Sequence, residues 1–276
     1  MSIHKTEAIV LNRRDFRETS LIADFFTRDF GKLSGLLKGI KTDLKKFASS
    51  VEPFSYNEII FYKKINSSLH LVSQCDTRDN FDAVRCDVFK IGIASCMMEL
   101  LGAIMAQEDR NEDVFDLCLA CLQELKTNHN PEKIATIFKI KMLAFSGFKP
   151  HFDSCVLCGD RILGQSKFSL SLGGLLCSRC QQKDMSSRIV FRGTVASVLH
   201  IEKNDFKNNL NLGMNPQIKR ELNMILNAFL NFHLEKELKS QKVLNNIKGH
   251  KGQSPIEEKY ISTGTVPCKE MGDSPL

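Results

Sequence analysis

Two Cys-x-x-Cys pairs constrain the fold of this chain more than any other feature. Cys155 and Cys158 form the first pair, and Cys177 and Cys180 form the second, eighteen residues further on. Zn²⁺ takes four soft ligands in a tetrahedron, and each Cys-x-x-Cys turn supplies two thiolates on one edge. Gly159 follows the first pair, where a chain that folds back around a metal often needs a positive φ. The spacing predicts one structural Zn²⁺, with no open position for a hydrolytic water.

Two other states of these thiols stay open, namely four buried free cysteines or two disulfides in an oxidising compartment. The chain begins Met-Ser-Ile-His-Lys-Thr-Glu, without the long apolar run of a signal peptide, and the other six cysteines have no framework spacing. We therefore expect a reducing cytosol, in which paired knuckles favour a metal site. A third Cys-x-x-Cys, from Cys118 to Cys121, lies in a helical apolar pattern and is predicted to belong to the core.

Strand-like alternation covers the first part of the chain, up to about Asp76. The pattern predicts five strands, Glu7–Asn12, Leu21–Thr27, Lys32–Lys38, Phe54–Lys63 and Ser68–Cys75. Five short strands within about seventy residues predict a small Greek-key barrel, of which the OB-fold is the commonest five-stranded form.

Helical periodicity follows and continues to about Leu244. It predicts helices at Phe89–Gln107 and Glu112–Thr127, one that begins at Asn130 and Pro131, one at Thr194–Lys203, and one opened by Asn215 and Pro216. The first of these carries charges and is too short for a membrane span. The predicted fold class is α+β multidomain, with an OB-fold domain at 1–78, a helical domain at 79–150 and 186–244, a zinc module inserted at 151–185, and a disordered tail at 245–276.

Basic residues gather in two segments, although the net charge of +6 is too small to indicate nucleic-acid binding alone. The first segment, residues 31–50, contains five lysines and one aspartate. A basic loop beside an OB barrel can follow the phosphates of a single strand. The predicted DNA contacts are Arg13, Arg14, Lys38, Lys41, Lys45 and Lys46, with Arg17 as a further candidate. The strand aromatics Phe54, Tyr56, Phe61 and Tyr62 either stack on bases or fill the barrel.

Signatures of catalysis are missing from the sequence. It contains no glycine-rich phosphate loop of the Walker or Rossmann kind, no supported Ser/His/Asp or Cys/His arrangement, and no carboxylate pair in an acid–base setting. The chain is therefore expected to be a binding protein and not an enzyme.

Four stretches carry a resemblance to a known family. They are Thr6–Leu11 with Glu18–Leu21, Phe26–Lys32 and Lys38–Gly39; Glu52–Ser55; Gly147–Pro150 leading into Cys155–Gly159; and Phe168–Ser169 with Gly173–Cys180. On these stretches, the chain resembles the RecO family of bacterial recombinational repair proteins over roughly residues 1–240. The resemblance implies a cytoplasmic, nucleoid-associated protein that binds single- and double-stranded DNA and anneals complementary strands. It also implies work with RecR, and often RecF, to help RecA load onto DNA coated by single-strand-binding protein.

The second basic segment brackets the amphipathic helix from Ile218 to His233. Its candidate partner-binding residues are Lys219, Arg220, Lys236 and Lys239. The family resemblance implies that the helical domain binds the acidic, apolar-tipped tail of single-strand-binding protein, and a basic rim would suit such a peptide. The alternative for this segment is a core helix with a solvated basic face. The alternative for the whole protein is a zinc-ribbon scaffold that bridges proteins without touching nucleic acid.

Overall fold

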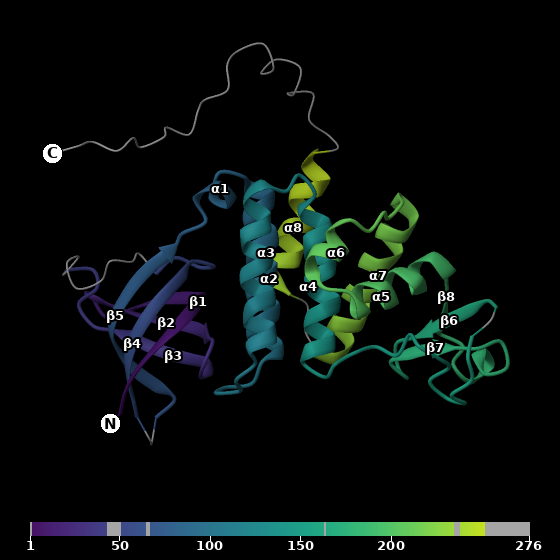
Figure 1. The fold of residues 1–276 in the computed structure, drawn as a ribbon, viewed down its shortest axis with the longest axis horizontal. Helices are drawn as coiled ribbons and strands as arrows, with labels where there is room; N and C mark the ends of the chain where they lie inside the picture. Colours follow the sequence, from purple (N-terminus) through teal and green to yellow (C-terminus); the bar gives the residue numbers. More distant parts are fainter. Residues whose placement is uncertain (1, 43–50, 65–66, 163, 235–237, 252–276) are drawn as a thin grey trace, which may run out of the picture.

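A closed five-stranded barrel forms the N-terminal part of the computed structural model, which describes residues 2–42, 51–64, 67–162, 164–234 and 238–251 (Figure 1). Its strands are β1 (Ser2–Phe16), β2 (Ser20–Thr27), β3 (Gly31–Leu37), β4 (Tyr56–Lys63) and β5 (Leu69–Asp79). They follow the order β1-β2-β3-β5-β4 around the barrel, and only β3 and β5 run parallel. This topology confirms the predicted OB-fold barrel.

All five predicted strands are present, but β1 and β5 extend beyond their predicted bounds. β1 pairs with β4 over Ser2–Ile9 and with β2 over Ala8–Phe16, so its polar ends are held by ladder hydrogen bonds and not by burial. The alternation of apolar residues in the sequence predicted only the buried middle of β1. Inside the barrel, Gly35 is required by space, because a Cβ there would lie 2.5 Å from the Val72 side chain.

Two of the four aromatics weighed as base-stacking residues fill the core instead. Phe61 is fully buried inside the barrel, and Phe54 is 3% exposed in the core shared with the helices. The Arg85 guanidinium lies 4.0 Å from the centre of the Phe54 ring. Tyr56 is half-buried and donates its hydroxyl hydrogen bond to Glu7. Phe54 and Phe61 are therefore unavailable to DNA bases.

Eight helices are described after the barrel, and one continuous core links them to it. They are α1 (Asp82–Arg85), α2 (Val88–Ile104), α3 (Glu112–Thr127), α4 (Pro131–Phe145), α5 (Arg192–Lys203), α6 (Phe206–Leu210), α7 (Pro216–Leu234) and α8 (Lys239–Lys251). Asn130 accepts a hydrogen bond from Lys133 N, and Asn215 accepts one from Ile218 N, so both predicted helix starts are correct. None of the helices within the described ranges has the length and apolarity needed to cross a membrane.

Cys118 and Cys121 lie fully buried in α3, as predicted for core residues. Burial raises the pKa of both thiols well above its usual value. These two cysteines are therefore protonated packing residues.

Helix α8 corrects the predicted start of the tail, because it continues past Leu244 to Lys251. Leu244 packs against α2 at Gly92, where a Cβ would lie 2.8 Å from the leucine side chain. At the other end of α8, the Glu99 carboxylate accepts hydrogen bonds from Lys239 N and Ser240 N. These tertiary contacts stabilise a helix whose own sequence is mostly polar. The rest of the predicted tail, residues 252–276, lies outside the described residues.

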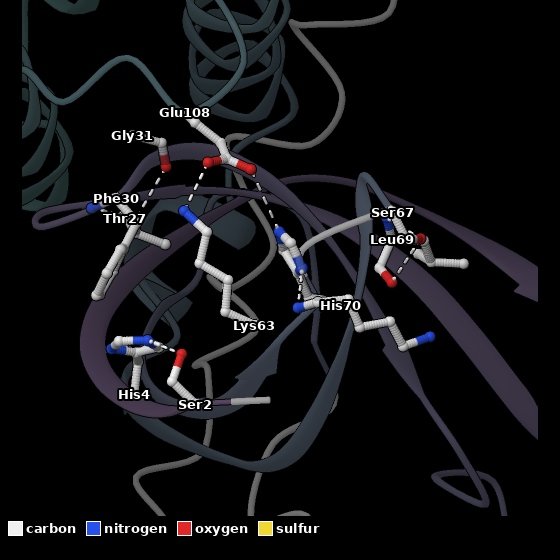
Figure 2. A network of polar contacts seen from close by, with 11 residues as sticks. Ser2, His4, Thr27, Phe30, Gly31, Lys63, Ser67, Leu69, His70 and Glu108 are labelled. Atoms are coloured by element: carbon white, nitrogen blue, oxygen red, sulfur yellow. Dashed lines mark hydrogen bonds and ion pairs between the residues drawn. The ribbon is translucent and has the colours of Figure 1, made fainter.

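The barrel is joined to the helices through the connection between α2 and α3 (Figure 2). The Glu108 carboxylate on this connection lies 2.6 Å from Lys63 Nζ and 3.7 Å from His70 Nε2, and both partners belong to the barrel. Gly31, the first residue of β3, has a φ of +63°, and a Cβ there would lie 2.2 Å from the Asp109 carbonyl oxygen. Backbone therefore packs directly on backbone at this joint. Figure 1 shows the barrel at one end of the molecule and the cysteine-rich module at the other, with the helices between them.

Candidate metal centre and nucleic-acid interface

The two cysteine knuckles are built on a small three-stranded sheet between α4 and α5. Its strands are β6 (Ser166–Ser169), β7 (Gly174–Leu176) and β8 (Arg188–Val190), in the order β7-β6-β8. The second knuckle follows β7 directly. The first is fixed to the same strand by a hydrogen bond of 2.8 Å from Val156 N to Leu175 O. Gly159 closes the first knuckle with a φ of +74°, the positive value that its position predicted.

The four sulfur atoms of Cys155, Cys158, Cys177 and Cys180 lie within 4.8 Å of one another. Four thiolates about 2.3 Å from a tetrahedral Zn²⁺ would lie about 3.8 Å apart. The Sγ atoms of Cys158 and Cys177 are 3.7 Å apart, which fits such a site and is far longer than a disulfide bond. None of the nine cysteines in the described part of the chain is in a disulfide. This donor set fits a metal ion that prefers soft ligands.

The electrostatics of the knuckles also favour a bound cation. Burial raises the pKa of Cys155, but backbone N–H groups of Cys177, Cys158 and Leu157 donate to its sulfur and lower the pKa to about 6. A hydrogen bond with Cys155 is the main cause that raises the pKa of Cys158. One thiolate thus forms readily, while further deprotonation among these close sulfurs needs a compensating positive charge.

His151 and Asp153, which precede the first knuckle, do not join the sulfur cluster. His151 Nε2 lies 2.7 Å from Ser154 Oγ, and Asp153 pairs with Lys149 at 3.0 Å. Among the described residues, the only group of potential metal ligands is the four cysteines. The arrangement is a closed four-sulfur shell of the structural kind.

Four of the six predicted DNA-contact residues come together at one end of the barrel. Arg13 and Arg14 lie near the end of β1, and Lys38 follows β3. Lys41 lies in the loop after β3, and its backbone N–H donates to Thr19 O in the β1–β2 turn at 3.1 Å. Lys45 and Lys46 lie outside the described residues. The arrangement places cations from two loops at the same end of the OB-fold.

Carboxylates accompany most of these cations. Three ion pairs are present in this region: Arg13 with Glu52 at 2.8 Å, Arg14 with Asp24 at 3.6 Å, and Lys41 with Asp15 at 2.9 Å. Lys38 is exposed and has no ion-pair partner among the residues that the structure describes. Exposed ion pairs contribute only about 0–1 kcal/mol each, so phosphates can replace these carboxylates at little cost.

Arg17 adds a further exposed cation at the tip of the β1–β2 turn. Its φ is +56°, and its guanidinium lies 5.3 Å from the centre of the Phe16 ring. A planar cation beside an aromatic ring at a hairpin tip can contact both phosphates and bases.

The second basic segment brackets a helix whose apolar stripe is not a groove floor along its whole length, although Phe229 and His233 at its end line two smaller cavities. The apolar stripe of α7 from Ile218 to Leu230 is buried in the core, and only His233 at its end is exposed. Lys219 lies close enough to Lys133 of α4 to lower the pKa of that lysine, after the larger effect of burial. Lys239, by contrast, lines a cavity beside the barrel. Arg220 is exposed on α7, and Lys236 lies outside the described residues.

One concave feature was not predicted at all. A cavity of about 750 Å³ lies between the barrel and α2, with Asn12 and Asp24 on one side and Met98 and Gln107 on the other. These residues come from four separate segments, so no local sequence pattern could have revealed it.

Comparison with known proteins agrees with this architecture. The family model described as "Recombination protein O N terminal" matches residues 1–81, and the one described as "Recombination protein O C terminal" matches residues 85–242. A protein described as "DNA repair protein RecO" from Alkaliphilus metalliredigens is 30% identical over 84% of this chain and 94% of its own length. Proteins with the same description from Syntrophus aciditrophicus and a Thermoanaerobacter species are 29% and 28% identical, over 89% and 90% of this chain and 96% and 99% of their own lengths. The chain belongs to the RecO family of DNA repair proteins.

Proposed function

We propose that this protein is a non-enzymatic recombination mediator that binds single- and double-stranded DNA and anneals complementary strands. The observation that carries the proposal is the convergence of Arg13, Arg14, Lys38 and Lys41 at one end of an OB-fold barrel. Membership of a DNA repair family supports it. The proposal places Lys45 and Lys46 at the same interface and assigns no bond-making step to any residue.

Binding at this interface would be an exchange of anions. Phosphates would replace Glu52, Asp24 and Asp15 on the basic side chains, and the DNA would release its condensed cations. Such contacts carry little sequence information, which suits a protein that acts wherever a strand is exposed. Neutralising the phosphates of two complementary strands also lowers the repulsion that opposes their pairing.

The four clustered cysteines are proposed to hold one structural Zn²⁺. When bound, the ion would cross-link the two knuckles and contribute the free energy that orders this short sheet. The chain itself then fixes the module to the helices. Phe152 stacks on Phe168 with ring centres 5.2 Å apart, and Phe168 contacts Phe229 of α7 at 6.3 Å.

The partners proposed for this protein follow from the family. It would act in the cytoplasm, at the nucleoid during repair, and would work with RecR and RecF to help RecA load onto DNA coated by single-strand-binding protein. The acidic tail of that protein would contact Lys219, Arg220, Lys236 and Lys239. The apolar residues of α7 from Ile218 to Leu230 are buried, so the four basic residues would attract the acidic tail through their charge.

The experiment compares two variants that carry the same charge change. Fluorescence anisotropy would measure binding of a labelled single strand to the parent, to Lys38→Glu/Lys41→Glu, and to Lys183→Glu/Lys203→Glu, whose lysines are exposed and far from the barrel in sequence. We expect the first variant to bind much more weakly and the second to bind like the parent. Equal affinity of the first variant and the parent would move the DNA site away from the barrel end. No DNA binding by the parent at any salt concentration would favour the protein-only scaffold.

A further inference from the structure

The cavity beside the barrel has a mixed lining of polar and apolar side chains. Its apolar part includes Leu11 and Met98, which are buried at 8% and 2% exposure. Exposed amide side chains stand at its rim, with Asn12 on β1 and Gln107 on the connection after α2. Helix α2 packs against β1, and the cavity lies at this boundary, with lining residues from both elements.

Three of the four charged side chains that line the cavity already have partners within the protein, and the fourth, Lys239, is exposed. Asp24 accepts a hydrogen bond of 2.5 Å from Ser34 Oγ, and Glu99 caps the start of α8. Lys32 Nζ donates to Gly102 O at 2.7 Å. A cationic ligand would have to displace one of these contacts, and an anionic one would have only Lys239 to pair with unless it did the same. An uncharged molecule with an apolar face and a polar edge would instead pack on Leu11 and Met98 and hydrogen-bond to the amide side chains.

The cavity also adjoins the proposed phosphate contacts. Arg14 pairs with Asp24, which lines the cavity, and Asn12 stands directly opposite Asp24 in the β1–β2 ladder. Asn12 and Arg14 are two residues apart on β1, so their side chains point to the same side of the strand. In OB-folds, the face formed by the second and third strands binds oligonucleotides, and this cavity contains one residue from each, Asp24 and Lys32.

We propose that the cavity receives a nucleobase of the single strand whose phosphates lie on the basic end of the barrel. The base would rest on Met98 and Leu11. Its polar edge would bond to the Gln107 amide and to the amide nitrogen of Asn12, whose oxygen already accepts from Arg13 N. The inference rests on the proposed DNA binding and adds to it a role for the helical domain, which completes a site that the barrel alone leaves open.

The test uses two labelled strands of equal length, an oligothymidylate and an abasic deoxyribose-phosphate chain. The parent is expected to bind the oligothymidylate more tightly, because only that strand has bases. Ser95 is half-buried on α2 and lines the cavity, so Ser95→Tyr should fill it. This variant should bind oligothymidylate about tenfold more weakly, which corresponds to about 1.4 kcal/mol, and bind the abasic strand like the parent.

A second variant keeps the proposal testable if Ser95→Tyr fails to fold. Asn12→Ala/Gln107→Ala removes two exposed amides and should weaken oligothymidylate binding alone, whereas the control Gln182→Ala/Asn211→Ala removes two exposed amides elsewhere and should change nothing. Equal binding of both strands by the parent would overturn the base site and leave the DNA proposal standing. A base preference that both cavity variants retain would also overturn it. Failure of the parent to bind either strand would refute both proposals.

Discussion

Replacing one knuckle cysteine tests the metal centre most directly. Cys177→Ser would substitute a weakly coordinating hydroxyl for one of four thiolates, and the second knuckle would lose its hold on the ion. The sheet β6-β7-β8 has strands of only three or four residues, too short to be stable without that cross-link. We therefore expect the module to detach locally from the helices.

The magnitude follows from what the module buries. Phe152 is 2% exposed and Phe168 is 4% exposed, and both rings would become solvated if the module opened. Burial of a phenylalanine side chain is worth about 1.5–3 kcal/mol, so the two together contribute about 3–6 kcal/mol. A small domain has only about 5–15 kcal/mol of net stability, so the loss should be large in a thermal melt.

The assay combines metal analysis with circular dichroism. The parent should contain one zinc ion per chain, and Cys177→Ser should contain much less and melt at a lower temperature. A chelator should lower the melting temperature of the parent and leave that of the variant nearly unchanged. Cys118→Ser is the matched control, because Cys118 belongs to the buried Cys-x-x-Cys of α3 and its replacement should cost stability without releasing zinc. Parent protein that is purified under reducing conditions and contains no zinc would refute the reasoning.

Four further predictions concern single contacts. Arg14→Gln should lower the slope of log affinity against log salt for single strands by about 0.7, measured by anisotropy, and an unchanged slope would exclude Arg14 from the interface. Glu99→Ala should speed amide hydrogen exchange in α8, because two backbone N–H groups lose their acceptor, and unchanged exchange would show that packing alone fixes the helix. Gly31→Ala should lower the melting temperature, since its Cβ would overlap the α2–α3 connection and the φ there is positive; an unchanged melt would mean that the joint is loose. Hydrogen bonds, first that from Ser169, lower the pKa of Asp184 to about 2, so its stabilising effect is present above about pH 4 and is lost as the pH falls toward 2. Acid titration of the melting temperature should therefore be shallower for Asp184→Asn, and parallel curves would contradict this.

Local patterns predicted the parts of the fold that depend on neighbours in sequence. Alternating apolar residues located the five strands, and Asn130 and Asn215 marked two helix starts. The cysteine spacing located the four-sulfur cluster, because each knuckle is a property of four consecutive residues. The same reasoning could not find α8, whose stability comes from Glu99 and Gly92, each well over a hundred residues away along the chain.

Long-range pairing also decides the candidate nucleic-acid site. The sequence contains Arg14 and Asp24 as separate charges, and only the β1–β2 register makes them partners. The stripe of α7 was ambiguous for the same reason, since an amphipathic pattern does not say whether its apolar side faces the core or a ligand. In the structure, the apolar residues of that side from Ile218 to Leu230 are buried.

The joint at Gly31 and Glu108 has a consequence for how the molecule can transmit force. Glu108 N donates to Lys32 O at 2.9 Å, and Arg28 bridges Glu7 of the barrel to Asp116 of α3. Rotation of the barrel against the helices would have to break these contacts, so they oppose such a rotation. A force applied to the barrel would therefore tend to move the helices with it. The cysteine-rich module, which is packed on those helices, would move in the same direction.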